Sequence, residues 1–273
     1  MLNECAVREL GSLLPLPLWA PTPHKRRLRA SVRHLDEVVY GMIARCRAQS
    51  GERPHLLSAL SHTVDEASHA LTDRDAHDAI VNLLLGGNET TATGIIWASS
   101  RLARHPEIQD DVRREVASVL RGSEPSAATL RQLPSLAQVL AEALRLYPPV
   151  YALPREAVEA VDLSGVHVPA GSLVNLVPFV THRAPLWFVR PGLFVPSRSE
   201  RERVCSWLVP PVRYRAAAVG HSFAMLESLA VLATILERFE LRPASDSPDV
   251  ELEAQVSLHP RGGLRLALEA VRA

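Results

Sequence analysis

The stretch "LTDRDAHDAIVNLLLGGNETTATGIIWASSRLARHP", residues 71–106, predicts one long helix. Thr72 stands at the expected N-cap, where its hydroxyl can accept a hydrogen bond from a main-chain N–H of the first turn. Asp73 and Asp75 place negative charge in that turn, which the helix dipole favours. The stretch contains no proline before Pro106, and its one pair of adjacent glycines is Gly86-Gly87. The stretch therefore predicts a helix of about 30 residues, roughly 45 Å long.

The middle of this helix, "GGNETT" at residues 86–91, contains residue types that helix stability alone does not favour. The two glycines would let another group approach the backbone, and Glu89 with Thr90 could relay protons or hold a water molecule. The same residues also fit a structural reading, in which the glycines permit close helix packing and Glu89 is solvated. The stretch alone leaves both readings open.

Further helices are predicted on both sides of this stretch. "KRRLRASVRHLDEVVYGMIARCRAQSG", residues 25–51, has an apolar stripe with helical spacing. "PEIQDDVRREVASVLRG", residues 106–122, has Pro at its first position and Gly at its end. In "SLAQVLAEALRLYPP", residues 135–149, Ser135 and Gln138 are spaced as a capping box. We therefore expect helical structure within residues 25–147.

From Val158 onward the apolar period changes to two, which is typical of strands. Turns at Ser164-Gly165 and Ala170-Gly171 predict a small antiparallel β region at residues 156–180. Residues 189–219 are expected to be irregular and residues 220–238 helical, and Gly262-Gly263 predicts a closing hairpin at 254–270. The predicted fold class is mainly α with a small antiparallel β region.

The composition excludes several classes of function. The chain has 273 residues, 47% of them hydrophobic, and a formal net charge of zero, so nothing favours a nucleic-acid partner. Its three cysteines fit neither a disulfide framework nor paired zinc motifs, which indicates a reducing compartment. The longest apolar stretch contains Asn82, Asn88 and Glu89, and the N-terminus lacks the features of a signal peptide. We expect a cytoplasmic protein with no membrane partner.

Three short features carry candidate chemistry. In "EALR", Glu142 and Arg145 are spaced for an ion pair on one helix face, although such pairs are common on exposed helices. Arg198 in "FVPSR" and Arg155 in "LPRE" could each contact an anion or only water. The spacing of His105, His182 and His221 predicts no metal site.

The ordered motifs "GGNETT", "EALRLYPP", "FVPSR" and "GHSFAMLE" closely resemble the cytochrome P-450 superfamily, over about residues 14–272. This resemblance implies the C-terminal two-thirds of that fold, as a single incomplete domain over residues 1–273. It implies a haem cofactor, a small apolar substrate that is oxidised, and electrons from a redox partner, a ferredoxin or reductase. By position it implies the following roles: Glu89 and Thr90 in oxygen activation, Glu142, Arg145 and Arg198 as a structural triad, Arg155 at a haem propionate, and Gly220 and Phe223 as cofactor contacts.

The haem-binding loop departs from the family pattern, roughly F-x-x-G-x-R-x-C-x-G, whose cysteine thiolate binds the iron. With Gly220 as anchor, the cysteine position holds Ala218, so no metal ligand is predicted. The aromatic, glycine and arginine positions of the loop hold Pro211, Tyr214 and Ala216. Cys205 lies thirteen residues upstream of the ligand position, and His221 lies inside the next helix. We expect that this chain does not bind haem.

A second departure is length, because the chain begins near the sixth or seventh helix of the family fold. This predicts an N-terminal truncation, which would leave the apolar helix at Ile80–Trp97 partly uncovered. A protein partner that covers this long helix is one expectation.

Three functions remain open from the sequence. The first is a monooxygenase by lineage that is inactive because of Ala218. The second is a haem-free binding or activator protein of a biosynthetic partner enzyme. The third is a decayed gene product: Lys25 is the only lysine among 30 basic residues, which indicates GC-rich codons. With such codons, residues 212–219 read one base forward as Phe-Gly-Thr-Gly-Arg-Arg-Pro and the start of a cysteine codon, so we hypothesise compensating frameshifts.

Overall fold

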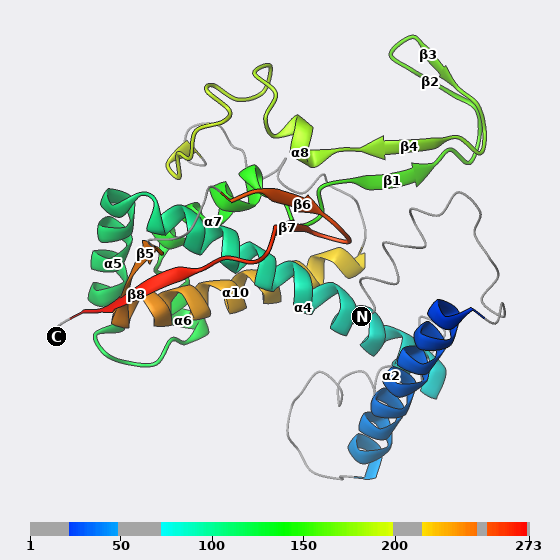
Figure 1. Cartoon of the computed structure of the whole chain (residues 1–273), viewed down its shortest axis with the longest axis horizontal. Helices are drawn as coiled ribbons and strands as arrows, with labels where there is room; N and C mark the ends of the chain where they lie inside the picture. The colour runs from blue at the N-terminus through cyan, green and yellow to red at the C-terminus, as the bar shows by residue number, and fades with distance from the viewer. Residues whose placement is uncertain (1–21, 49–71, 199–214, 245–249, 272–273) are drawn as a thin grey trace. The chain divides into compact units, whose positions relative to one another are not determined.

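The computed structural model describes residues 22–48, 72–198, 215–244 and 250–271 (Figure 1). The chain forms two compact units, residues 1–88 and 89–273, which divide within the long helix α4 (Asp73–Ala103). The described residues are mainly helical and carry small antiparallel sheets, which confirms the predicted fold class. Among the described helices, none is both long and apolar enough to cross a bilayer. The prediction of one domain over residues 1–273 stays a prediction.

The first unit contains α2 (Pro23–Ala48) and the beginning of α4. Apolar side chains from the two helices form a small core, made of Val39, Ile43, Ala76 and Ile80. Arg47 Nη1 lies 2.5 Å from Asp73 Oδ1, and His77 Nε2 lies 3.0 Å from Asp36 Oδ1. These ion pairs and the apolar contacts join the two helices.

The start of α4 has the predicted N-cap. The Asp75 N–H donates to Thr72 Oγ1 over 3.2 Å, and the Thr72 N–H donates to Asp75 Oδ2 over 3.0 Å. The Thr72 hydroxyl also donates to this carboxylate, and these hydrogen bonds lower the pKa of Asp75. The reciprocal bonds satisfy main-chain donors that an uncapped helix would leave without partners.

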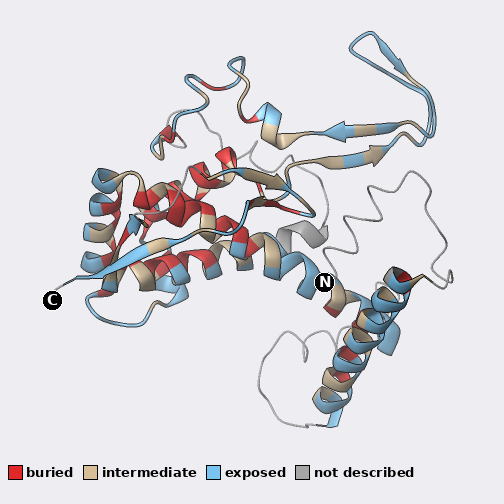
Figure 2. Ribbon diagram, viewed as in Figure 1, coloured by how far each residue is buried: buried red, intermediate tan, exposed pale blue. Residues whose placement is uncertain are grey.

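In the second unit, four helices pack with the rest of α4 around one core. They are α5 (Pro106–Leu120), α6 (Ala127–Leu130), α7 (Pro134–Leu146) and α10 (Arg215–Arg238). Figure 2 shows the buried residues where these helices face one another. The largest fully buried leucines are Leu102, Leu120, Leu133, Leu136, Leu140, Leu232 and Leu236. Because full burial of one such side chain contributes about 1.5 to 3 kcal/mol, this core holds the helices together.

The N-terminus of α7 is held by Glu115 of α5, and the capping box predicted at Ser135 is wrong. Pro134 occupies the first turn of α7, and the structure gives the N-cap residue no side-chain hydrogen bond. The two carboxylate oxygens of Glu115 instead accept the N–H groups of Ser135 over 2.9 Å and Leu136 over 3.1 Å. A carboxylate from a neighbouring helix therefore takes the place of a local cap.

The predicted β region forms two antiparallel pairs. They are β1 (Leu153–Glu156) with β4 (Leu173–Leu176), and β2 (Val161–Leu163) with β3 (Val166–Val168). Ser164 and Gly165, between β2 and β3, have φ values of 51° and 86°. Positive φ at both central residues is typical of a tight hairpin turn, so the turn predicted at Ser164-Gly165 is confirmed.

The strands on either side of Gly262-Gly263 do not pair with each other, which corrects the closing hairpin predicted at 254–270. Instead, β6 (Leu252–Ala254) pairs with β7 (Leu258–Pro260), and β8 (Leu266–Ala270) pairs with β5 (Phe239–Pro243). The buried Gln109 side chain fixes β5 on α5, since its amide bonds both main-chain groups of Leu241 over 2.7 and 2.9 Å. The edge of β5 is thereby presented to β8, and the glycine turn carries the chain from one sheet to the other.

The helix expected from residue 220 begins earlier, because α10 starts at Arg215. Irregular backbone was expected up to residue 219. Residues 215–218 read Arg-Ala-Ala-Ala, and these residue types have high helix propensities, which explains the earlier start. Position 218 therefore lies within a helix.

Candidate functional site

Glu142 and Arg145 lie one turn apart on α7 and form a bidentate ion pair. Arg145 Nε donates to Glu142 Oε2 over 2.7 Å, and Arg145 Nη2 donates to Glu142 Oε1 over 2.8 Å. The Arg145 side chain is 0% exposed and the Glu142 side chain is 4% exposed. The pair is therefore a buried structural element and not the solvated helix pair that the spacing alone would also allow.

The remaining N–H groups of Arg145 bind main-chain carbonyls of a distant segment. Nη1 donates to the carbonyl oxygens of His182 over 2.6 Å and Pro191 over 2.9 Å, and Nη2 donates to that of Leu193 over 3.2 Å. All five N–H donors of this guanidinium therefore have acceptors. One side chain of α7 thus holds residues 182–193 in place.

Arg198 joins the same network. Its Nε donates to Glu142 Oε1 over 3.3 Å, its Nη1 donates to the Val189 carbonyl over 2.7 Å, and its side chain is 5% exposed. The Val195 N–H also donates to Glu142 Oε1, over 3.0 Å. The structure therefore brings Glu142, Arg145 and Arg198 together around a single carboxylate. Since these contacts already use the donors of Arg145 and both oxygens of Glu142, the network braces the chain and presents no group to a substrate.

Glu89 of α4 contacts the β6–β7 hairpin. Its Oε1 lies 2.5 Å from His259 Nε2, and it accepts a hydrogen bond from Ser257 Oγ over 2.8 Å. On the other side of the ring, His259 Nδ1 lies 3.4 Å from Thr93 Oγ1. Glu89 and His259 are 24% and 25% exposed, so solvent reaches both. Glu89 is thus not merely solvated, which was one reading of "GGNETT", but is held by the hairpin.

The chemistry open to this cluster is limited by its geometry. Ser257 Oγ and Glu89 Oε1 both approach the same ring nitrogen, His259 Nε2, at 2.8 and 2.5 Å. A hydrolytic triad needs the hydroxyl and the carboxylate on opposite nitrogens of the ring, so this is not one. The carboxylate and imidazole are close enough to exchange a proton, but the proton relay that is one reading of Glu89 stays a prediction.

Two threonines of α4 lie beside this cluster in the sequence. Thr90, the predicted partner of Glu89, is half-buried. Thr91 is buried, and its hydroxyl oxygen has no hydrogen-bond partner among the described residues. The contacts place Glu89, and the predicted oxygen-activation pair of Glu89 and Thr90 stays a prediction.

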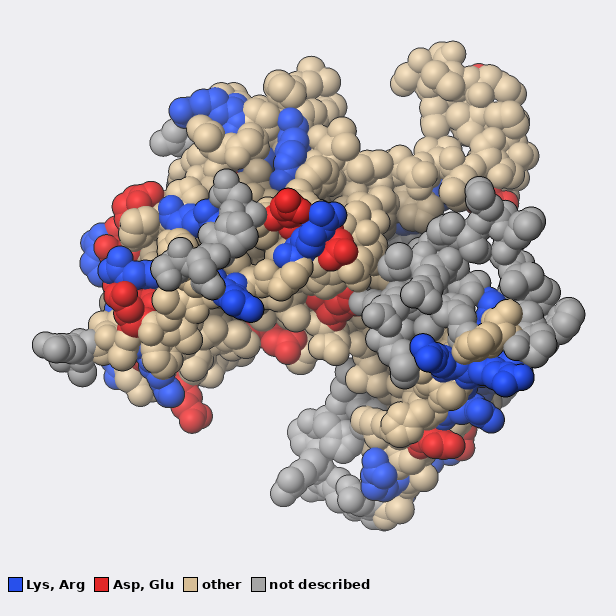
Figure 3. Space-filling view, viewed as in Figure 1, with Lys and Arg blue, Asp and Glu red and all other residues tan. Residues whose placement is uncertain are grey.

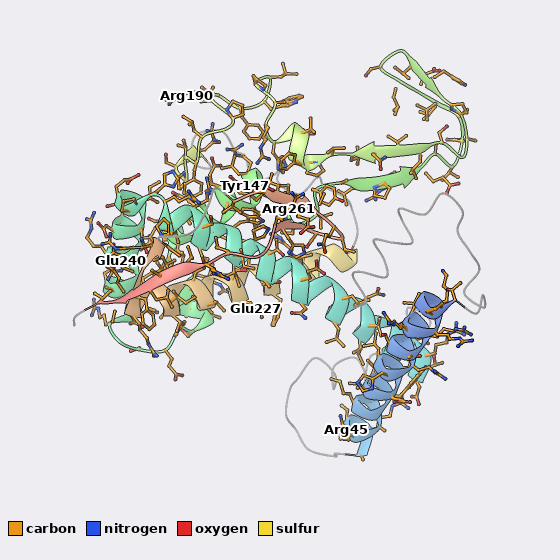
Figure 4. The ribbon with its side chains drawn as sticks, viewed as in Figure 1. Arg45, Tyr147, Arg190, Glu227, Glu240 and Arg261 are labelled. Atoms are coloured by element: carbon orange, nitrogen blue, oxygen red, sulfur yellow. The ribbon has the colours of Figure 1, made fainter. Side chains whose placement is uncertain are left out.

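Tyr147, which Figure 4 labels, stacks on the buried Trp97 of α4. The ring centroids of Trp97 and Tyr147 are 4.3 Å apart, and Trp97 Nε1 donates to the Leu258 carbonyl of β7 over 2.8 Å. The Arg183 guanidinium lies 5.4 Å from the Tyr147 ring, and burial lowers the pKa of Arg183. This aromatic contact joins α4, the end of α7 and the hairpin that holds Glu89.

The three predicted cofactor contacts are dispersed over two elements. Arg155 lies on β1, where its Nη1 donates to the Pro154 carbonyl over 2.8 Å. Gly220 and Phe223 lie in α10, and Phe223 is 70% exposed. The described contacts do not join these three residues into one site, so their assignment stays a prediction.

The position that the resemblance assigns to the cysteine ligand is Ala218, and this position lies in α10, so its backbone is helical. The expectation that the chain does not bind haem stays a prediction. Cys46 lies on α2 in the first unit, and Cys5, Cys205, Pro211 and Tyr214 lie outside the described residues. His221 is exposed, and no group of three or more His, Cys, Asp or Glu side chains within the described ranges could hold a metal ion.

Ser257 and His259 are the site residues that sequence reasoning missed. They lie two apart at β7, so a strand places both side chains on one face. This spacing was the available signal, but the expected hairpin around Gly262-Gly263 paired the strand differently. The contact with Glu89 spans about 170 residues of sequence and could not be read from local pattern.

Comparisons with known proteins agree with the fold. The family model described as Cytochrome P450 matches residues 2–266. Cyclooctatin synthase of Streptomyces melanosporofaciens is 35% identical over 245 residues, 87% of this chain and 52% of that protein. Pentalenene oxygenase of Streptomyces avermitilis is 31% identical over 264 residues, 92% of this chain and 56% of that protein. The crystal structure of the cytochrome P450DA heme domain aligns with a TM-score of 0.82 at 25% identity, covering 91% of this chain and 56% of that one.

The chain spans about half the length of the curated relatives that it matches. The match of the family model nevertheless covers nearly the whole chain. The network on α7 and the contacts of Glu89 lie within the matched residues. The chain belongs to the cytochrome P450 family.

Proposed function

We propose that this chain does not itself carry out haem-thiolate monooxygenation, although its lineage is that of a monooxygenase. One observation supports the proposal: the residue at the position that the resemblance assigns to the ligand is Ala218, and it lies inside α10. A methyl group cannot coordinate iron, and a helical turn there does not have the backbone of a ligand loop. Oxidation of a small apolar molecule, with electrons from a ferredoxin or reductase, would then belong to haem-binding relatives.

The test is the absorbance spectrum of the purified chain after incubation with haem, reduction and addition of carbon monoxide. We expect no thiolate-type band from the unchanged chain. Ala218→Cys should also give no thiolate-type band, because the helix remains. A variant in which a family-like loop replaces residues 212–219 tests the effect of the loop alone. Stoichiometric haem with a thiolate-type spectrum in the unchanged chain would refute the proposal.

We also propose that the present loop arose by compensating frameshifts in a GC-rich gene. The support is that residues 212–219 can be encoded so that the next reading frame yields a family-like loop. The gene sequence tests this directly. A sequence across these codons that yields no such loop in another frame rules the frameshifts out.

A haem-free binding or activator protein is the second candidate. It is favoured by exposed apolar side chains along α4, which a protein partner could cover; they are Leu83, Leu84 and Leu85. Addition of the purified chain to a biosynthetic glycosyltransferase of its own organism should then raise that enzyme's rate without haem. Leu84→Glu should abolish the effect, and equal activation by that variant would count against this role.

A further inference from the structure

Two arginine side chains of the second unit lie against the Tyr147 ring. The guanidinium carbon of Arg101, on α4, lies 5.1 Å from the ring centroid, and that of Arg183 lies 5.4 Å from it. Trp97 covers one face of the same ring at 4.3 Å. Both arginines are half-buried. Two positive charges that are partly withdrawn from water therefore share one aromatic ring.

Within the described residues, neither of these two charges has a carboxylate at ion-pair distance. The Arg101 side chain also has no hydrogen-bond acceptor among those residues, although its Nε is buried. Arg183 has one acceptor, because its Nη1 donates to the Phe179 carbonyl over 3.3 Å. A buried donor without an acceptor is unfavourable, since it has lost its hydrogen bond to water and gained no other.

The surroundings of Arg183 supply further positive charge. The residue follows α8 (Pro178–Thr181), and the sequence from 163 to 198 contains no Asp or Glu. Figure 3 shows isolated positive side chains on an otherwise uncharged surface over α8 and the segment after it. Burial is the main cause that lowers the pKa of Arg183, and the positive charge of Arg145 lowers it further. Because charges withdrawn from water are normally paired, this place favours an anion.

The aromatic contacts leave the N–H edges of the guanidiniums for another acceptor. The guanidinium carbon of Arg183 lies only 3.8 Å from the Phe179 ring centroid, so the face of its planar group packs on that ring. The five N–H donors of a guanidinium lie in its plane, away from such a stack. Phosphate oxygens accept these donors in pairs. An oxyanion beside Tyr147 would therefore meet donors.

We propose that Arg101 and Arg183 bind a phosphate group beside Tyr147. A phosphate carries up to two negative charges, which match the two cations, and its oxygens accept several hydrogen bonds. Half-burial strengthens the attraction, because charges interact more strongly where less water surrounds them. Free phosphate and a phosphate ester offer the same group for recognition.

This binding goes beyond the proposed function and does not depend on it. Tyr147 and both arginines lie outside residues 212–219, the loop on which the haem test depends. We therefore expect phosphate binding whatever the outcome of the haem test.

Isothermal titration calorimetry of the full chain tests the proposal, with inorganic phosphate and glycerol phosphate as separate ligands at constant ionic strength. We expect at least one of them to bind, and the tighter ligand distinguishes free phosphate from a phosphate ester. Arg101→Gln should weaken binding about tenfold or more, since a charge and its N–H donors are lost. Because the Arg101 side chain makes no hydrogen bond to the described residues, this variant should keep its fold, which circular dichroism checks.

The matched control is Arg131→Gln, which removes an exposed arginine of the same unit and should bind phosphate as the parent does. Thermal unfolding gives a second measurement, because a ligand that binds the folded chain raises Tm. Phosphate also stabilises proteins without specific binding, so the rise in Tm should be compared between variants and should be smaller for Arg101→Gln than for the control. Equal binding by the parent and Arg101→Gln, or equal weakening in both variants, would show an adventitious ion only. Failure of both ligands to bind the parent would also overturn the proposal.

Discussion

Glu142→Gln should destabilise the second unit strongly. The substitution preserves the shape of the side chain but leaves the guanidiniums of Arg145 and Arg198, 0% and 5% exposed, without a carboxylate. Glu142 accepts N–H groups from both arginines and from Val195. A glutamine can accept through one oxygen only, and its NH₂ group would face donors.

The expected loss is about 3 to 5 kcal/mol, the range measured when one partner of a buried ion pair is removed. That is a large part of the total stability of a typical domain, about 5 to 15 kcal/mol. Urea unfolding followed by tryptophan fluorescence measures it, because Trp97 is buried in the same unit. With a slope of about 2 to 3 kcal/mol per molar, the midpoint should fall by roughly 1 to 2 M.

The control is Glu124→Gln, which neutralises an exposed carboxylate and should change stability by no more than about 0.5 kcal/mol. Adding Arg198→Gln to Glu142→Gln removes one of the two stranded cations, so the double variant should lose less than the sum of the single losses. A loss below about 1 kcal/mol for Glu142→Gln, or strict additivity in the double variant, would show that the network is not a coupled ionic unit.

Two further predictions concern the hairpin and the helix cap. His259→Gln removes the contact with Glu89, so amide exchange in β6 and β7 should accelerate about fivefold, as expected for a partly exposed hydrogen bond worth about 1 kcal/mol. The control is His167→Gln, which removes an exposed pair on another hairpin and should leave amide exchange in β6 and β7 unchanged. If His259→Gln also left this exchange unchanged, the result would contradict the contact. Because the cap lowers the pKa of Asp75 below its ordinary 3.8, its stabilisation should be full above that value and be lost as pH falls through the lowered pKa. Asp75→Asn should lack this acid-dependent component in helix content measured by circular dichroism, and a pH profile unchanged from the parent would refute the assignment.

The helices were predictable because their signals are local. Thr72 and Asp75 are three residues apart, and the structure shows both hydrogen bonds of their reciprocal cap. The beginning of α7 was not predictable in the same way, since its cap comes from Glu115 on another helix. Local periodicity identifies a helix, whereas the groups that satisfy its ends can come from anywhere in the fold.

In the candidate site, too, the contacts between residues close in sequence could be predicted and the long-range contacts could not be predicted from local pattern. Glu142 and Arg145 are three residues apart on α7, so their pairing follows from helical geometry. Arg198 is 56 residues from Glu142, and only the family resemblance proposed that they meet. The contacts of Glu89 with Ser257 and His259 were missed, because nothing in the local pattern indicates which strand face reaches α4.

The sequence by itself determined the helix positions, the small β region and the family, because each depends on residues close together or on ordered motifs. It also determined that position 218 carries no iron ligand, since that depends only on residue identity. The tertiary structure alone decided that β8 pairs with β5 and that Glu89 is held by the β6–β7 hairpin. Strand pairing and buried polar contacts depend on which surfaces remain after the helices have packed. Groups from the whole chain compete for these surfaces, so no single segment decides the outcome.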